Sequence, residues 1–272
     1  MPSWTVDAPK RLDFDDVTTL KVRLMAGTVA VLASDDPPSM VVTELTGRPL
    51  QVTQEGGELT ISYESLSWEG LLGFLKPRHD SVAVTITVPA DCPIQLGVLS
   101  ASAIVSGLRS GAAVKGMSGD VTLDGVTGNV EAETMSGEIA ARDIDGEVRF
   151  KSMSGGLLLA DGWLDCLEAN TMSGQIAADV TLRAEGNVHV STMSGDVTLR
   201  LPAGSDAQVR LQSTSGAVRS EFESLRAVKA PASHTVSGNV GAGTGRVSVS
   251  TMSGSVTLLR RLRREGKESE TR

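Results

Sequence analysis

Residues 117–123 read Met-Ser-Gly-Asp-Val-Thr-Leu, and this pattern of a Met-Ser-Gly triplet before an alternating run recurs along the chain. Further triplets begin at residues 135, 153, 172, 193 and 252. Two degenerate copies, Thr-Ser-Gly at 214 and Val-Ser-Gly at 236, precede the last triplet. A repeat period of about 20 residues is typical of a solenoid, in which each repeat forms one rung of a stack.

Alternating side chains predict two strands in each rung. Val121 and Leu123 share one face of the first strand, and Val130, Ala132 and Thr134 share one face of the second. Period two with one apolar face indicates a half-buried strand, and such a pair cannot bury that face without neighbours. We therefore predict an all-β, right-handed parallel β-solenoid with rungs of about 18–22 residues. An antiparallel stack of β-hairpins is compatible with the same spacing.

The glycine of each triplet is expected to turn the chain at a corner of the rung. Such a turn commonly needs one residue with a positive φ, which glycine adopts without a Cβ penalty. We therefore predict a positive φ at these corners. The repeat-turn glycines are Gly119, Gly137, Gly155, Gly174, Gly195, Gly216, Gly238 and Gly254.

These repeats, together with an upstream Ala-Gly-Thr-Val-Ala-Val copy at residues 26–31, resemble the bacterial putative-adhesin repeat family, also called toastrack domains. The resemblance covers roughly residues 15–258. It implies a β-repeat fold and an association with cell-envelope stress systems. It implies no catalytic residue, because members of the family are mostly functionally uncharacterised.

The repeat pattern divides the chain into four parts. Residues 1–16 are expected to form an N-terminal lead, and residues 17–95 a strand-rich portion that covers the first open edge of the stack. Residues 96–258 form the Met-Ser-Gly solenoid. Residues 259–272 form a basic C-terminal tail, which is expected to begin with a short capping helix.

Composition narrows the class of function. The net charge of -8 and the aromatic content of 3% disfavour a nucleic-acid binder. Cys92 and Cys166 lack a metal or redox spacing, which favours two free thiols in a reducing compartment. We expect no secretory signal, because residues 1–16 contain no basic region followed by an apolar core. We also expect no membrane span, because no apolar run reaches about 18 residues. We therefore expect a cytoplasmic protein, peripheral to a membrane at most.

No catalytic constellation, metal site, cofactor or small-molecule ligand is predicted. The residue after each Ser-Gly pair is acidic in only some copies, so a stacked carboxylate ladder is interrupted. The three histidines are dispersed. Serines that recur in every rung suit a corner, whereas an active site is needed once.

One stretch outside the repeat pattern gathers large apolar residues before two basic ones. It either packs on the N-terminal sheet or contacts a protein partner or an anionic membrane surface. The basic tail offers a second contact of this kind. The candidate interaction residues are Trp68, Leu71, Leu72, Phe74, Leu75, Lys76, Arg78, Arg260, Arg261, Arg263 and Arg264.

The methionine of each triplet has two alternative positions. Straight alternation places Met135 and its equivalents in one exposed ladder, at a cost of roughly 25 cal/mol per Å² of apolar area. A change of parity at the corner would turn them inward to cap the core, and we favour this arrangement. An exposed ladder would instead form a surface for a dimer or another partner.

We therefore expect a non-enzymatic scaffold or interaction protein, and the repeat is compatible with a homo-oligomer. The alternative is a solenoid carbohydrate-acting enzyme. A groove that gathers several carboxylates and aromatics from neighbouring rungs would distinguish the enzyme from the scaffold.

Overall fold

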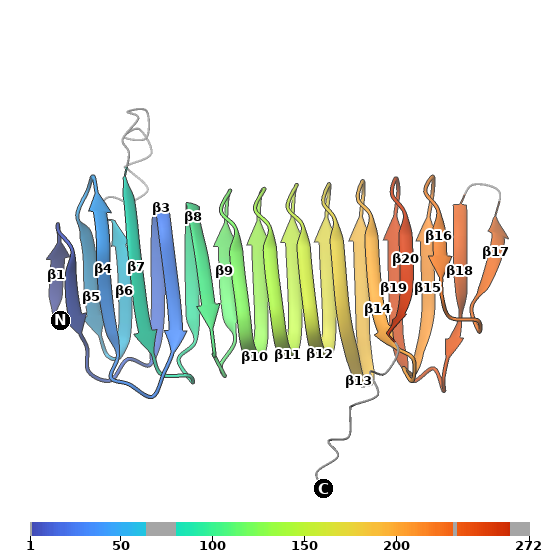
Figure 1. Cartoon of the computed structure of the whole chain (residues 1–272), viewed down its shortest axis with the longest axis horizontal. Coiled ribbons are helices and arrows are strands. Elements are labelled where there is room, and N and C mark those ends of the chain that lie inside the picture. The colour runs from blue at the N-terminus through green and yellow to red at the C-terminus, as the bar shows by residue number, and fades with distance from the viewer. Residues whose placement is uncertain (1, 64–79, 231–232, 262–272) are drawn as a thin grey trace, which may run out of the picture.

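Strands lie side by side along one long axis and form an elongated stack (Figure 1). The computed structural model describes residues 2–63, 80–230 and 233–261. Within these ranges the chain forms 20 strands joined in one sheet, and no helix. The described residues accordingly include no helix that could cross a membrane. The predicted all-β class is confirmed.

Four long strands form the regular centre of the stack. Each pairs in parallel with the next, and the register repeats by one rung, so that Val121 lies beside Ile139 and Val130 beside Val148. The predicted parallel solenoid is therefore confirmed, and these strands do not form the alternative hairpin stack. The four strands are β10 (Val121–Thr134), β11 (Ile139–Ser152), β12 (Leu157–Thr171) and β13 (Ile176–Thr192).

The stack continues toward the N-terminus through three further levels. β9 (Ala112–Gly116) and β8 (Ile94–Ser106) run parallel to β10, and β3 (Thr19–Ala33) runs parallel to β8. On its other side β3 pairs in parallel with β6 (Glu58–Tyr63) and β7 (Ser81–Val88). The boundary expected at residue 96 falls inside β8, so the N-terminal portion and the repeats share one continuous sheet.

Antiparallel strands close this end of the molecule. β4 (Ser39–Thr46) pairs with β7, and β5 (Leu50–Glu55) pairs with β6. The residues expected to form a lead supply two more strands, β1 (Ser3–Val6) on β5 and β2 (Lys10–Asp13) on β4. These strands are only four residues long, which limits the backbone edge offered to other chains.

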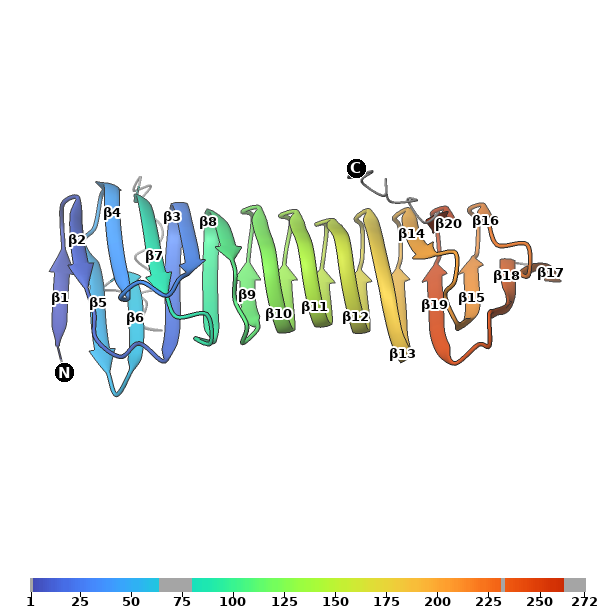
Figure 2. The ribbon, with the colours of Figure 1, turned by 60° about the horizontal axis from the view of Figure 1, so that its bottom comes forward.

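The last triplet stacks out of sequence order (Figure 2). β19 (Gly245–Thr251) lies between β13 and β15 (Ala207–Ser213), and it runs parallel to both. β20 (Val256–Arg261) lies in the same way between β14 (Val197–Pro202) and β16 (Val218–Ser220). The rung that carries Met252 therefore sits between the rungs of Met193 and Thr214, although it follows both in the chain.

The second degenerate triplet does not form a rung corner. Gly238 lies inside β18 (Ser233–Val240), which pairs antiparallel with β15 and with β17 (Arg226–Ala230). The prediction that Gly238 is a repeat turn is therefore wrong. The Val-Ser-Gly segment runs straight because it belongs to a hairpin that covers the outer edge of β15, and a strand that ends the stack has no further rung to join.

The core consists of the inward columns that alternation predicts. Each apolar side chain assigned to the inside of the repeat strands is buried, and large aliphatic residues fill the thin space between the sheet faces. The prediction is confirmed for both strands of the rung. Representative buried side chains are Val121, Leu123, Val130, Ile139, Val148, Phe150, Leu157, Leu167, Ile176, Val188, Leu199, Leu211, Val249 and Leu258.

The corner glycines are required by close packing and not by a positive φ. None of the seven true corner glycines has a φ in the left-handed region, so the predicted conformation is wrong. A Cβ on Gly137 would lie 2.1 Å from the carbonyl oxygen of Gly119, and one on Gly174 would lie 2.2 Å from that of Gly155. Because the rungs stack backbone on backbone at this corner, no side chain fits between them.

The C-terminal tail begins as a strand. Leu258 and Leu259 belong to β20, which extends through Arg261. The capping helix expected there is therefore not formed by residues 259–261. Residues 262–272 lie outside the described part of the chain.

Candidate functional site

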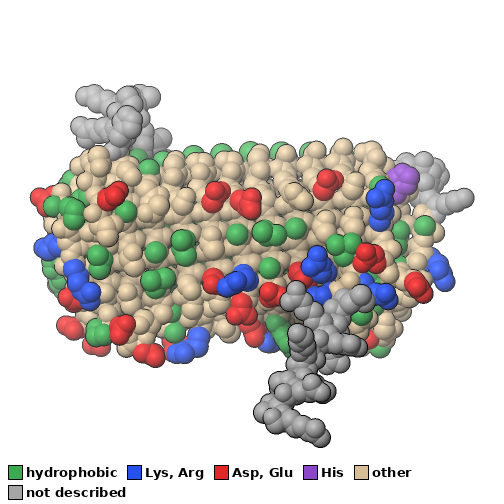
Figure 3. All heavy atoms as spheres, in the orientation of Figure 1, with side chains coloured by type: hydrophobic (Ala, Val, Ile, Leu, Met, Phe, Trp, Pro, Cys, Tyr) green, Lys and Arg blue, Asp and Glu red, His purple; other side chains and the backbone are tan. Residues whose placement is uncertain are grey.

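Six methionines form one exposed row along the corners of the stack, which we call the methionine edge. Their side chains are between 45% and 58% exposed. Figure 3 shows a row of hydrophobic side chains along the upper rim of the molecule, where these corners lie. The members are Met117, Met135, Met153, Met172, Met193 and Met252.

The favoured expectation that these methionines cap the core is wrong. Alternation continues through the corner, so Thr134 points inward and Met135 points outward. The inward hydroxyl closes the corner in place of a thioether: Thr134 Oγ1 accepts a hydrogen bond from the Gly137 amide at 3.0 Å, and Ser152 Oγ accepts one from the Gly155 amide at 2.6 Å. A short polar side chain can satisfy a buried amide there, which methionine cannot do.

Hydrogen bonds between rungs hold the backbone of the methionine edge in place. The Met135 amide donates to the carbonyl of Gly116 at 3.3 Å, and the Ser136 amide donates to the carbonyl of Met117 at 2.9 Å. The same pattern repeats at the next corners. The thioethers therefore extend from fixed points that are one rung apart.

The out-of-order rung makes the row continuous. The Ser253 amide donates to the carbonyl of Met193 at 2.9 Å, and the Ser215 amide donates to the carbonyl of Met252 at 3.1 Å. Stacking in chain order would have placed Thr214 between the last two methionines. In the observed order all six methionines are neighbours.

Charges of both signs flank the methionine edge. Lys115, Glu133 and Lys151 lie on one side of the row, and Lys115 pairs with Glu133 at 3.0 Å. Asp120 and Glu138 follow the triplets on the other side. The row is therefore an apolar strip between polar borders.

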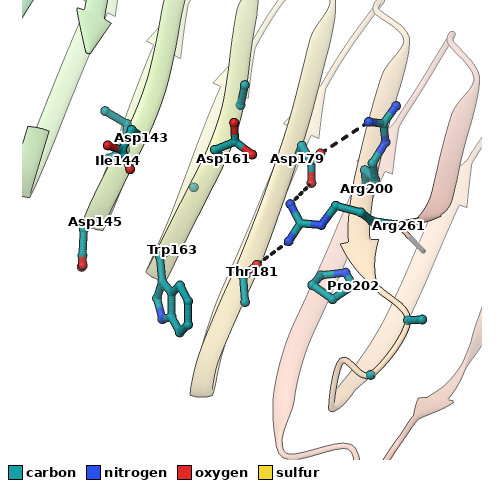
Figure 4. Close-up of a pocket in the computed structure, with 14 residues that line it drawn as sticks. Asp143, Ile144, Asp145, Asp161, Trp163, Asp179, Thr181, Arg200, Pro202 and Arg261 are labelled. Atoms are coloured by element: carbon teal, nitrogen blue, oxygen red, sulfur yellow. Dashed lines mark hydrogen bonds and ion pairs between the residues drawn. The ribbon is translucent and has the colours of Figure 1, made fainter. Parts of the chain in front are cut away.

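A second surface, which we call the Trp163 groove, lies at the end of the rungs that is opposite to the methionine edge. Figure 4 shows residues that line it. The groove is a cavity of about 1170 Å³ lined by residues of β11, β12, β13, β14 and β20 and of the segment after β14. Trp163 is 56% exposed. Asp143 and Asp161 lie at a stacked corner with φ values of 52° and 53°, a conformation that Asp tolerates better than most residues.

Half of the carboxylates in the Trp163 groove are neutralised by arginines. Asp179 accepts from Arg261 at 2.6 Å and from Arg200 at 3.4 Å. Asp145 pairs with Arg183 at 2.5 Å. Such pairs suit the binding of a polar ligand more than proton transfer. Among the described residues, no group of three or more His, Cys, Asp or Glu side chains is placed to hold a metal ion.

The two cysteines are poor nucleophiles at neutral pH. Burial raises the pKa of the Cys92 thiol to about 11. Partial burial, followed by the nearby Glu147, also raises the pKa of the Cys166 thiol. Both thiols are free, so they remain largely protonated and unreactive.

The predicted interaction residues fall into two groups. Residues 68–78, together with Arg263 and Arg264, lie outside the described part of the chain. Arg260 and Arg261 belong to β20, where the Arg260 amide donates to Glu221 at 2.7 Å and Arg261 pairs with Asp179. Arg261 therefore lines the Trp163 groove.

Trp163 and Asp179 were not anticipated as candidate residues. Trp163 follows Gly162 and precedes the buried Leu164. Alternation along the strand therefore predicts that the Trp163 side chain points outward. Asp179 gave no such signal, because its arginine partners lie 21 and 82 residues away in sequence.

Together, the parallel rungs, the Met-Ser-Gly corners and the antiparallel end strands define a capped β-solenoid. The model of the Toastrack DUF4097 family matches residues 17–259, and the chain belongs to this family. The family resemblance in the repeats is therefore confirmed. No curated protein matches the chain significantly.

The solved structures that match the chain include proteins from several bacteria. A putative adhesin from Bacteroides fragilis is 12% identical, with a TM-score of 0.43, and the match covers 95% of this chain and 97% of that one. A putative lipid binding protein from Parabacteroides distasonis is 16% identical, with a TM-score of 0.42 over 93% and 97%. A putative cell adhesion protein from Clostridium sporogenes is 12% identical, with a TM-score of 0.29 over 93% and 100%.

Proposed function

We propose that this chain is a non-enzymatic interaction protein that binds a protein partner along the methionine edge. The observation that carries the proposal is the continuous row of six half-exposed methionines on a fixed backbone. Contiguous apolar surface on a soluble protein marks an interaction site more often than single exposed residues do. Methionine also adapts its shape to the surface that it meets.

A protein partner suits the methionine edge better than an anionic membrane. Lys115 and Lys151 would attract anionic headgroups, but Glu133, Asp120 and Glu138 on the same borders would be repelled by them. Mixed charges beside an apolar strip are typical of protein interfaces, which have an apolar centre and a polar rim.

The test compares two variants that carry six substitutions each on the methionine edge. Serine at all six positions removes the apolar strip, whereas leucine preserves its hydrophobic character. The proposal predicts that a partner bound by the wild-type protein is retained by the leucine variant and lost by the serine variant. Thermal melts check that both variants are folded. A partner that binds all three proteins equally would contradict the proposal. Anionic liposomes that bind the wild-type protein and the leucine variant but not the serine variant would also contradict it.

We further propose a setting in bacterial envelope-stress physiology, with a cytoplasmic location and peripheral membrane contact through residues 68–78 and the basic tail. This proposal is supported by the sequence alone: the apolar stretch, the basic residues and the family resemblance. Co-sedimentation with anionic liposomes tests the membrane contact. The wild-type protein should sediment, and a folded Trp68/Leu71/Leu72/Phe74→Ser variant should stay in solution. Equal sedimentation would assign these residues to another role.

The Trp163 groove favours a second candidate function, which is action on a carbohydrate. It gathers carboxylates and one aromatic side chain from neighbouring rungs, and an exposed indole can stack on a sugar ring. Asp143 and Asp161 are the carboxylates that form no salt bridge among the described residues, so they are its candidate acid and base. Turnover of a polysaccharide by the wild-type protein that is lost in both Asp143→Asn and Asp161→Asn would establish the enzyme and overturn the non-enzymatic proposal.

A further inference from the structure

The methionine edge has a shallow hollow that is lined by methionines from three consecutive rungs. Met135, Met153 and Met172 line an open cavity of about 430 Å³, together with Thr134 and Ser152. Each methionine follows an inward hydroxyl residue and starts from a backbone that is hydrogen-bonded to the rung before it. Three sulfur atoms on flexible side chains can therefore reach one point above the hollow.

The spacing of the rungs suits a metal ion bridged by sulfur. Neighbouring strands lie about 4.8 Å apart, and a metal–sulfur bond of about 2.3 Å places two sulfurs on one ion at most about 4.6 Å apart. Adjacent methionines therefore need little change in position to share an ion. The third thioether approaches from the next rung by rotation about its own side-chain bonds, of which methionine has three.

We propose that Met135, Met153 and Met172 form a binding site for one soft monovalent metal ion, Cu(I) or its analogue Ag(I). Thioethers are soft ligands that select Cu(I), whereas magnesium and calcium require oxygen ligands. A thioether carries no proton to be displaced, so three such groups form a neutral ligand set. The proposed metal binding needs the sulfur atoms of these side chains, whereas the proposed partner contact needs their apolar surface.

The charged rim of the hollow does not exclude a cation. Glu133 and its partner Lys115 neutralise each other. Lys151 is exposed, so its repulsion of a bound ion is screened by solvent and salt. The bonds to soft sulfur determine the affinity, and we expect binding to change little between low and moderate salt.

The experiment measures the competition of the protein with a chromogenic Cu(I) chelator under anaerobic, reducing conditions. All proteins carry Cys92→Ala and Cys166→Ala, which remove the thiol ligands. The test variant is Met135→Leu/Met153→Leu/Met172→Leu. The matched control is Met117→Leu/Met193→Leu/Met252→Leu, which removes as many methionines from the same edge but leaves the hollow intact. Circular dichroism and Ag(I) titration accompany each protein.

We expect the wild-type background and the control to withdraw Cu(I) from the chelator with similar affinity, and the test variant to bind at least about tenfold more weakly. Affinity should be unchanged between about pH 5 and 8, because thioethers do not titrate, whereas a site built on histidine would weaken as it protonates. Absence of binding by the background, equal loss in both triple variants, or a fall in affinity on acidification would each overturn the site.

These results also separate the metal site from the partner proposal. The Cu(I) measurement contains no protein partner, so its outcome does not depend on whether the methionine edge binds one. Weaker Cu(I) binding by the test variant than by the control supports the metal site alone. Retention of Cu(I) binding by the test variant overturns the metal site and leaves the partner experiment unaffected.

Discussion

At the residue scale, the corner glycine shows how a backbone contact selects an amino acid. The carbonyl oxygen of each corner approaches the next glycine so closely that a Cβ would lie between 1.8 and 2.2 Å from it at all seven corners. The rung spacing at this corner is therefore set by glycine. An alanine would have to push two rungs apart, and the rest of the sheet resists that displacement.

We predict that Gly137→Ala destabilises the protein by about 1–3 kcal/mol, the usual cost of forcing extra atoms into a packed site. The matched control is Gly204→Ala, because a Cβ on Gly204 would meet no atom within 4 Å. Denaturant unfolding of both variants provides the comparison. Equal midpoints for the two would show that the rungs are not in backbone contact at this corner.

Tyr63 provides a second test at the residue scale, because it is the only tyrosine in the chain. Burial, and then the nearby Asp80, raise the pKa of its phenol to about 12, while Arg48 acts in the opposite direction. The ordinary pKa is about 10. The folded protein therefore favours the protonated phenol, and this contribution to stability is complete below about pH 10 and is lost as the pH rises toward 12.

We predict that unfolding free energy falls by on the order of 2 kcal/mol across that interval and that Tyr63→Phe removes this part of the fall. The ultraviolet absorbance of tyrosinate measures the titration directly in the folded protein. A midpoint near pH 10 in the folded state would contradict the burial of the phenol.

Alternation along the strands could be predicted from sequence, but the two features of the corner could not. The columns of Val121 and Val130 follow from period two, which depends only on local backbone geometry. The direction of Met135 depends on which group satisfies the Gly137 amide, and that group is Thr134 of the same corner. The need for Gly137 depends on the neighbouring rung, because the carbonyl that it approaches lies 18 residues back in the chain. The second contact is not visible in a single repeat.

At the scale of elements, the order of the rungs is the least expected feature. The repeats of Met193, Thr214 and Met252 carry nearly the same local pattern, so sequence alone favoured stacking in chain order. The alternative order follows from β17 and β18, which form an antiparallel hairpin on β15 and occupy the outer position. The next rung is then left to fill the gap beside β13.

We predict that cysteines at Met193 and Met252 form a disulfide, whereas cysteines at Met193 and Thr214 do not. Adjacent rungs place the Cα atoms about 4.8 Å apart, within the range of a disulfide, and rungs two levels apart exceed about 7 Å. The pairs are made in the Cys92→Ala/Cys166→Ala background, and mass spectrometry reads the cross-link after mild oxidation. Cross-linking of the Thr214 pair in place of the Met252 pair would mean that the rungs stack in chain order.

At the scale of the whole molecule, an elongated stack offers long surfaces that run across many repeats. One of them, the methionine edge, spans six rungs. The sequence pattern allows both an exposed row of methionines and a buried one, and it does not decide between them. The Trp163 groove was not anticipated, because its residues come from β11 to β14 and β20 and meet only after the stack forms. A fold of repeated rungs can be predicted from one repeat, whereas a groove between unequal rungs cannot.

The central claim is that the six methionines form an exposed edge, and the rate at which each methionine is oxidised tests it most directly. Dilute hydrogen peroxide converts accessible methionine to its sulfoxide, and peptide mass spectrometry follows each position. The structure predicts rapid oxidation at all six positions of the methionine edge and slow oxidation at Met40, whose side chain is 0% exposed. Protection of the six to the same degree as Met40 would place them in the core and contradict this structure and the function proposed from it.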